Sequence, residues 1–292
     1  MKLRNYSNIN TLNLLLPWVI TFAVFWLYPL IYASYLSLTE YSTLSNEARL
    51  IGFENYSRML SDELFWQALS NTAIFTFGTV PVTTAIALLL ASILNDKYTK
   101  LRGVFRASYF IPSVTSLVVI SLIFTNLYSQ NGYINFILSK LNLPFPERGW
   151  LQEPQTALFS IMAMDVWMAV GYYMVLFLAG MQTIPSDLYD AAELAGASAW
   201  QKFWRITFHM LRPTLLFVVV INTIKSFQVF VEIYVMTKGG PLGTTTTIVY
   251  MIYDNAFSKS DSMGYAAAVA YVLFIILILF SFLQMKLLKV KY

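Results

Sequence analysis

The stretch TALFSIMAMDVWMAVGYYMVLFLAGM, residues 156–181, contains a single charged side chain, Asp165. A hydrocarbon core of about 30 Å needs about 20 apolar residues of helix to cross it, so this stretch predicts one membrane span. Further runs of this kind predict spans at roughly 12–37, 67–94, 106–128, 213–236 and 265–285. We therefore expect an all-α polytopic membrane protein, in which residues 1–292 form a single transmembrane domain of six helices.

The composition agrees with this interpretation and excludes several other classes of protein. Of the 292 residues, 58% are hydrophobic and 12% are charged, whereas about a quarter of the residues in a soluble domain are charged. The chain has no cysteine and one histidine, His209. Disulfides, thiol nucleophiles and multi-histidine metal sites are therefore excluded, and a membrane-embedded enzyme becomes the weakest alternative.

The lysine and arginine residues predict the orientation of the chain. If the N-terminus is cytoplasmic, the inner segments hold 12 of the 19 basic residues and the outer loops hold 6, while Lys225 lies inside a span. Positive charges gather on the cytoplasmic side of membrane proteins. We therefore expect both termini of this protein to lie in the cytoplasm.

The segment 184–212, between the fourth and fifth predicted spans, predicts two short helices outside the membrane. Ser186 is a plausible N-cap of the first helix, and Gly196 ends it. Ser198 and Gln201 fit a capping box that begins the second helix. One face of the first helix carries mostly small side chains, which allow another surface to approach: Leu188, Ala191, Ala192 and Ala195. The alternative is an amphipathic loop that rests on the bilayer surface.

This segment resembles the coupling-loop signature of permease subunits in binding-protein-dependent ABC importers. That signature is an acidic residue, two alanines, three further residues and then Gly-Ala. The matching residues here are Asp190, Ala191, Ala192, Gly196 and Ala197. The family usually has Glu in place of Asp190 and proline in place of His209. The resemblance implies that these five residues contact a cytoplasmic ATPase subunit, and that ATP is hydrolysed in that separate chain.

The resemblance extends to Phe227–Phe230, Thr237–Pro241 and Asp261–Ala268, which look like the carbohydrate branch of these permeases, the maltose, multiple-sugar and glycerol-phosphate type. It implies alternating access in a bacterial or archaeal plasma membrane. It also implies a second homologous permease subunit, two copies of the ATPase subunit and an extracytoplasmic binding protein that delivers the carbohydrate. We expect contact with membrane lipid, no nucleic acid partner and no cofactor in this chain, because the ATPase uses the ATP and Mg.

Polar side chains inside the spans predict the substrate site, because ionisable residues in a membrane usually face a cavity or a partner. If 213–236 is one helix, a polar stripe follows one side of it: Asn222, Lys225, Ser226, Val229 and Glu232. Comparison with the maltose-type permease implies sugar contacts from a partly overlapping set: Asp165, Trp167, Met168, Ala169, Tyr172, Asn222 and Ser226. Aromatic faces pack against sugar rings, while amides and carboxylates bond to hydroxyl groups.

Several alternatives stay open at this point. Lys225 forms a structural pair with Glu232 or Asp165, or it contributes to an anionic substrate site. In a proton-coupled secondary transporter, Asp165, Lys225 and Glu232 would instead carry protons. Membrane threonines commonly bond to the backbone of their own helix. We expect this structural role for the stripe in the second span: Thr72, Thr76, Thr79 and Thr83.

Overall fold

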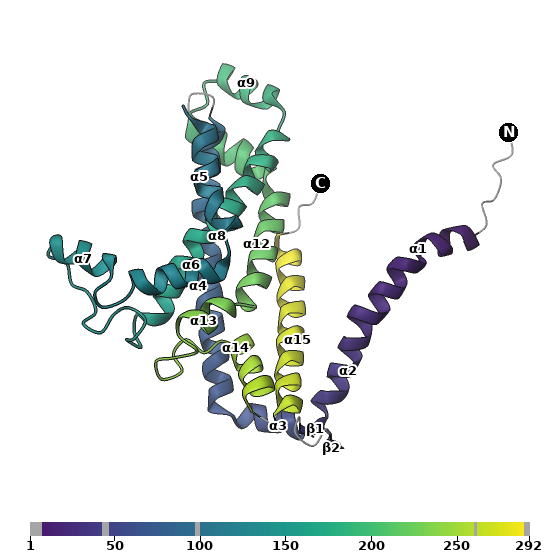
Figure 1. Ribbon diagram of the computed structural model, residues 1–292. Helices are drawn as coiled ribbons and strands as arrows, with labels where there is room; N and C mark the ends of the chain where they lie inside the picture. Colours follow the sequence, from purple (N-terminus) through teal and green to yellow (C-terminus); the bar gives the residue numbers. More distant parts are fainter. Residues whose placement is uncertain (1–7, 43–46, 97–99, 260–261, 289–292) are drawn as a thin grey trace. The chain divides into compact units, whose positions relative to one another are not determined.

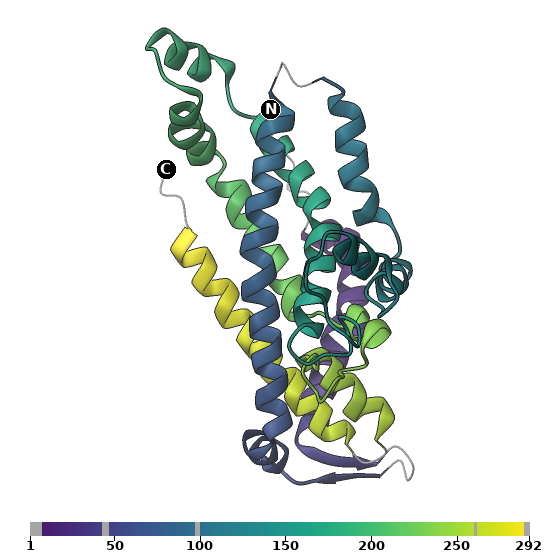
Figure 2. The same ribbon diagram turned by 90° about the vertical axis from the view of Figure 1, so that its left-hand side faces the viewer.

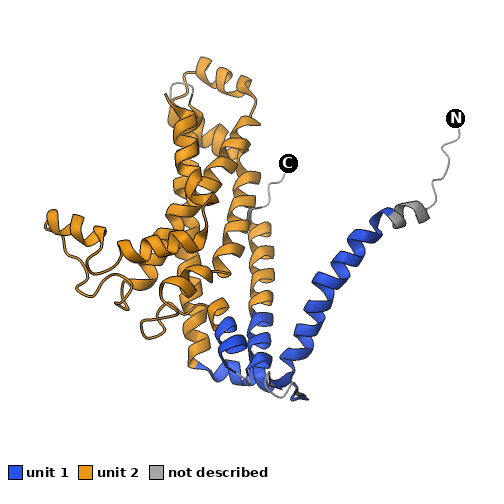
Figure 3. Ribbon diagram, viewed as in Figure 1, with its two compact units in different colours: residues 1–62, 252–272 blue, residues 63–251, 273–292 orange. Residues whose placement is uncertain are grey.

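The computed structural model describes residues 8–42, 47–96, 100–259 and 262–288 (Figure 1). The chain forms two compact units, residues 1–62 with 252–272 and residues 63–251 with 273–292 (Figure 3). In the described part, five helices are long and apolar enough to cross a membrane, or six if one bent pair counts as a span. The mostly helical architecture and the set of spans agree with the sequence analysis.

The first unit contains the first predicted span and a small structure that follows it. Helix α1 (Asn8–Phe22), the π-helical turn η1 (Ala23–Leu27) and α2 (Tyr28–Ser37) form the span. An antiparallel hairpin of β1 (Thr39–Ser42) and β2 (Glu47–Leu50) precedes α3 (Glu54–Ser61). This short hairpin is a small β element in a mostly helical fold, and no pattern in the sequence predicted it.

The same unit also holds η3 (Asp254–Ser258) and the first turns of α15 (Met263–Leu288). The side chain of Asn55 is buried and donates hydrogen bonds of 3.0 and 2.9 Å to the carbonyl groups of Ser37 and Thr39. A Cβ atom on Gly264 would lie 1.9 Å from the Thr39 carbonyl oxygen. Glycine is thus required where α15 approaches β1.

The second unit is a helical bundle around α4 and α8. Helix α4 runs along its length, and the segment 184–212 lies at the end where α4 finishes (Figure 2). Small buried residues such as Ala87 and Ala91 let α4 pack closely against Phe177 of α8. Its main helices are α4 (Glu63–Asn95), α5 (Arg102–Val114), α6 (Leu117–Leu127), α7 (Tyr133–Lys140), α8 (Ala157–Gln182), α12 (Arg212–Phe227), α13 (Val231–Met236) and α14 (Ile248–Tyr253).

The third predicted span, 106–128, is not one straight helix. Helices α5 and α6 meet at an angle of 96° across the break at residues 115–116. Helix α5 packs so tightly against α8 that a Cβ atom on Gly171 would lie 1.8 Å from the Tyr109 carbonyl oxygen. Helix α5 is therefore in close contact with α8, and the chain changes direction only after Val114.

The fifth predicted span, 213–236, is also interrupted. Helix α12 ends at Phe227, and α13 begins at Val231 after a non-helical stretch at 228–230. Phe230 has φ −144°, outside the helical range. The prediction of a polar stripe along one continuous helix is therefore wrong, because Glu232 belongs to a different helix from Asn222 and Lys225.

Candidate functional site

The first half of the segment 184–212 forms α9 (Ser186–Leu194). Its N-cap is Pro185, so the prediction of Ser186 as N-cap was one residue late. Gly196 follows the helix with φ +74°, a conformation that favours glycine. Here the amide of Gly196 donates to the Glu193 carbonyl oxygen, and the amide of Ala197 to that of Ala192, each at 2.9 Å. Gly196 thus ends α9, as predicted.

The second half forms a further short helical segment made of α10 (Ala199–Lys202), η2 (Phe203–Thr207) and α11 (Phe208–Met210). The predicted capping box is confirmed. The Gln201 amide donates to Ser198 Oγ at 3.3 Å, and the Ser198 amide donates to Gln201 Oε1 at 2.8 Å. His209 lies in α11 and does not end the segment early.

Two side-chain contacts hold the halves of this segment together. Lys202 Nζ lies 3.2 Å from Glu193 Oε2, and the hydroxyl groups of Tyr189 and Thr207 lie 2.9 Å apart. Tyr189 also packs against the bundle core. Ile184, Ile206 and Leu211 join the same core, so the fold of the segment depends on its own contacts and on several anchors in the bundle.

The five predicted ATPase-contact residues lie on the outer surface of this segment. Helix α9 contains no buried residue, and Leu194 is 93% exposed. Asp190, Ala191 and Gly196 are exposed, while Ala192 and Ala197 are half-buried. A Cβ atom on Gly196 would meet nothing within 4 Å. Within this chain, the small side chains are thus not required for packing, and they leave a shallow surface open to a partner.

A hollow of about 280 Å³ lies between α5, α8 and α12, and some of the predicted substrate residues line it. Four of them line it: Met168, Ala169, Tyr172 and Lys225. Tyr172 is 44% exposed, and Lys225 is also exposed, so an aromatic ring and an ammonium group are both accessible. The hollow can therefore offer a ligand an aromatic surface and a positive charge.

The other predicted substrate residues do not line this hollow. Trp167 is 51% exposed and packs against the Phe124 ring. The remaining four are at most 7% exposed: Asp165, Asn222, Ser226 and Glu232. Ser226 Oγ lies 3.3 Å from Thr79 Oγ1 of α4. These four residues therefore face the packed interior rather than the hollow.

Three lining residues were not predicted: Ser113, Tyr173 and Ile221. Ser113 Oγ donates to the Met168 carbonyl oxygen at 2.6 Å and accepts from the Tyr172 amide at 3.1 Å, so it fixes α5 against α8. This contact joins segments far apart in the sequence, and no local pattern indicates it. Ile221 is one turn before Lys225 on α12, so helical spacing from Lys225 could have predicted that Ile221 lies on the same face.

The three charged residues of the predicted fourth and fifth spans form no contact pair in the described part of the chain. No ion pair within 4.0 Å joins Lys225 to Asp165 or Glu232, although the Lys225 charge acts on both carboxylates across a longer distance. The predicted structural pairing of Lys225 is therefore wrong as a direct salt bridge.

The threonine stripe of α4 is only partly explained by backbone bonding. Thr72 and Thr79 donate to the carbonyl groups of Ala68 and Phe75, four residues earlier. Thr76 and Thr83 are equally buried, yet their hydroxyl groups have no hydrogen-bond partner in the described structure. The predicted structural role thus holds for half of the stripe.

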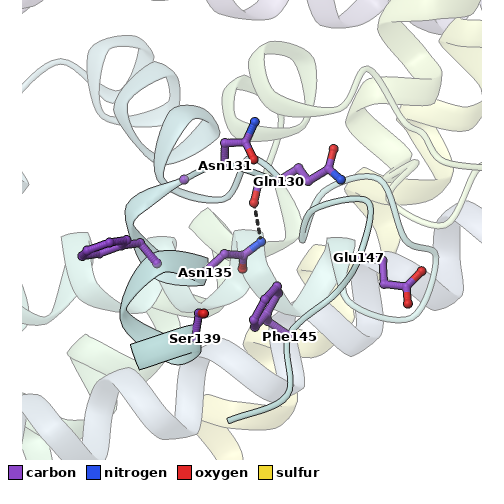
Figure 4. Close-up of a pocket in the computed structure, with 8 residues that line it drawn as sticks. Gln130, Asn131, Asn135, Ser139, Phe145 and Glu147 are labelled. Carbon is purple, nitrogen blue, oxygen red and sulfur yellow. Dashed lines mark hydrogen bonds between the residues drawn. The ribbon is translucent and has the colours of Figure 1, made fainter. Parts of the chain in front are cut away.

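Two further hollows lie beside the loops of the second unit. One, of about 600 Å³, is bordered by α7 and contains Gln130, Asn131, Phe145 and Glu147 (Figure 4). Another, of about 410 Å³, lies where α6 and α13 end and contains Arg148 and Thr237. The loop after α13 is fixed to α4, because Asn71 Nδ2 donates to the carbonyl groups of Gly243 and Thr246. That loop therefore has a defined structure.

Comparison with known proteins identifies the family. The profile of the binding-protein-dependent transport system inner membrane component matches residues 83–289. The chain belongs to this family. This permease is thus an ABC transporter subunit that spans the membrane, and the match includes α8, α12 and the segment 184–212 between them.

Curated relatives are similar along nearly the whole permease. The lactose transport system permease protein of Rhizobium radiobacter is 36% identical over 285 residues, which cover 97% of this chain and 95% of that protein. The trehalose/maltose transport system permease protein of Thermococcus litoralis is 34% identical and covers 94% and 91%.

A solved structure has the same fold. It is a bacterial alginate ABC transporter in complex with an alginate pentasaccharide-bound periplasmic protein. One of its chains matches with a TM-score of 0.83 and 23% identity, and the match covers 99% of this permease and all of that chain. At this identity the likeness supports the architecture of the permease and nothing finer.

Proposed function

We propose that this permease is the membrane-spanning subunit of an ATP-driven importer for a carbohydrate. The observation that carries the proposal is the exposed surface around α9, with Asp190, Ala191 and Gly196, in a chain that belongs to a binding-protein-dependent family. The relatives named above transport lactose and trehalose or maltose. The accessible Tyr172 ring in the hollow is a group suited to a sugar ring.

The proposed assembly contains a second homologous permease, two copies of a cytoplasmic ATPase subunit and an extracytoplasmic binding protein. The ATPase subunits bind ATP and Mg, and this chain itself is not catalytic. Residues Asp190, Ala191, Ala192, Gly196 and Ala197 contact the ATPase, so closure of the ATPase pair moves α8 and α12, which flank the segment. Both compact units act as one permease domain in this assembly.

The orientation in the proposal places the segment 184–212 and both termini in the cytoplasm of a bacterial or archaeal cell. The excess of basic residues in those segments supports this orientation. The hollow between α5, α8 and α12 then receives substrate from the outer side and releases it inward by alternating access.

The first test is isolation of the tagged permease from its native membrane in mild detergent after cross-linking in the cell. The proposal expects a second permease and an ATPase subunit in the isolated complex. A homo-oligomer without an ATPase subunit would contradict it. A Gly196→Asp chain isolated in parallel is expected to keep the second permease but to lose the ATPase, which assigns the contact to this segment.

A further inference from the structure

The three charged residues of the predicted fourth and fifth spans differ in exposure. Asp165 and Glu232 are 7% and 4% exposed, and neither lines the hollow between α5, α8 and α12. Lys225 is exposed and does line it. The hollow therefore presents a positive charge, while both nearby carboxylates are turned into the packed interior.

The Lys225 ammonium group has no partner at contact distance in the described structure. The nearest carboxylates act on it only through space, since no salt bridge joins them. An unpaired charge at membrane depth costs free energy unless it faces water or a ligand of opposite charge. The other groups around the hollow are neutral: Ser113, Met168, Ala169, Tyr172, Tyr173 and Ile221.

A second hollow in the same unit also contains a basic residue. Arg148 lines the hollow of about 410 Å³ at the ends of α6 and α13, and no carboxylate lines that hollow, although the Glu153 carboxylate accepts a hydrogen bond of 3.5 Å from the Arg148 backbone amide. Arg148 forms no ion pair with the other described residues. Each of these two hollows thus has a basic residue and no carboxylate among the residues that line it.

We propose that the substrate of this permease is an anionic carbohydrate, whose carboxylate, sulfonate or phosphate group is bound by Lys225 in the hollow while its sugar ring packs against Tyr172. This inference rests on the proposed function and names the substrate class of the same site. Lys225 is then the residue that determines charge specificity.

The electrostatic part of the proposal can be measured without knowing the substrate. The chain contains no cysteine, so an introduced thiol is the single thiol of this chain, and its labelling is read on this chain after separation from its partners. Ile221→Cys places a thiol in the hollow, four residues before Lys225 on the same face of α12. Leu242→Cys places a reference thiol at a site that is 86% exposed. The complete complex is labelled with an anionic sulfonatoethyl and a cationic trimethylammonioethyl methanethiosulfonate.

The ratio of anionic to cationic labelling rates in the Ile221→Cys complex, relative to the Leu242→Cys reference, is expected to favour the anionic reagent. Lys225→Gln is expected to lower this ratio roughly tenfold, because one full charge acts at short range. Lys225→Arg retains the charge and the ratio. Lys140→Gln removes one positive charge from α7, outside this hollow, and is expected to change nothing. A ratio equal to that of the reference thiol, or one that Lys225→Gln leaves unchanged, would overturn the inference.

Two further measurements separate a failure of this inference from a folding defect and from a failure of the proposed function. Since Lys225 also attracts Asp165, Lys225→Gln is measured a second time together with Asp165→Asn, which removes the unbalanced carboxylate. If the complex transports a neutral sugar with ATP and Lys225→Gln keeps uptake within about twofold, the inference is wrong and the proposed function stands. If no carbohydrate uptake depends on ATP, the proposed function itself fails, and the thiol ratio still reports the charge of the hollow.

Discussion

The segment 184–212 and the hollow between α5, α8 and α12 present their side chains in opposite ways. In the segment, the candidate residues point outward, and none of α9 is buried. In the hollow, Met168, Ala169 and Tyr173 are buried and form its walls, while Tyr172 and Lys225 remain accessible. The first arrangement suits a flat contact with a protein partner. The second suits a small ligand held by a few groups.

The two regions also differ in what holds them in place. The segment is held by local contacts, including the Ser198–Gln201 capping box and the Glu193–Lys202 ion pair. The hollow is held by contacts between distant helices, such as the two hydrogen bonds of Ser113 to α8. Changes in the segment are therefore expected to affect partner contact, and changes around the hollow to affect helix packing or the ligand.

The largest expected effect is at Gly196. Gly196→Asp is expected to reduce transport at least about a hundredfold while membrane insertion is retained, because a charged side chain would enter the partner surface. Backbone strain alone costs roughly 1–2 kcal/mol. Gly52→Asp is the matched control, since Gly52 also has positive φ and nothing within 4 Å. Uptake assays with both variants decide the point, and normal transport by Gly196→Asp would remove the coupling role from the segment.

The next largest effect concerns the close contact between α5 and α8, two of the helices around the hollow. Gly171→Ala would place a Cβ atom 1.8 Å from the Tyr109 carbonyl oxygen, so α5 and α8 must separate. We expect a loss of stability of about 1–3 kcal/mol, the usual cost of overpacking. Gly103→Ala, in α5 with nothing within 4 Å, is expected to be neutral. Thermal unfolding of the purified permease measures both variants, and equal stabilities would mean that the close α5–α8 contact is absent.

Tyr172 and Trp167 lie on the same helix, α8, but only Tyr172 lines the hollow, so substitutions at these two residues test whether the substrate binds there. Tyr172→Ala is expected to lower uptake roughly tenfold through weaker substrate binding, because an aromatic contact of about 1 kcal/mol or more is lost. Trp167→Ala is expected to have little effect, since Trp167 lies outside the hollow against Phe124. Concentration-dependent uptake compares the two, and the reverse order would place the substrate elsewhere on α8.

The smallest effect is at the Glu193–Lys202 ion pair. Its side chains are 75% and 25% exposed, and exposed pairs contribute about 0–1 kcal/mol. Glu193→Gln is therefore expected to leave transport within about twofold of normal, and the double exchange Glu193→Lys with Lys202→Glu is expected to leave it equally unchanged. A large loss in the ATPase activity of the complex that the double exchange fails to restore would show that Glu193 contacts the partner directly.

The helices of the segment followed from its sequence because their signals are local. Gly196 supplies a left-handed end, and Ser198 and Gln201 cap the next helix within four residues of each other. The hydrophobic runs predicted the positions of the spans for the same reason. The breaks at 115–116 and 228–230 were not predictable in this way, since neither stretch contains glycine or proline. The bend at 115–116 lies directly after the contacts of Ser113 with α8, which join segments far apart in the sequence.

The hollow shows the same limit at the level of single side chains. Lys225, Tyr172 and Ala169 stood out as polar or matched positions in spans, and they do line it. Asn222 and Glu232 have the same chemical character but are buried in the packed interior, and Glu232 belongs to α13, which begins after the interruption that follows α12. Ser113 joins the site only through contact between α5 and α8. A sequence pattern selects candidates, and the helix packing decides which of them a ligand can reach.

The most direct test of the account is uptake by the isolated complex in proteoliposomes, with ATP enclosed on the side of the segment 184–212 and binding protein with carbohydrate on the other side. The account predicts uptake that requires ATP, persists when a protonophore removes the proton gradient and disappears with Gly196→Asp. Uptake that needs the proton gradient and ignores ATP would contradict it, and would transfer attention to Asp165, Lys225 and Glu232 as proton carriers.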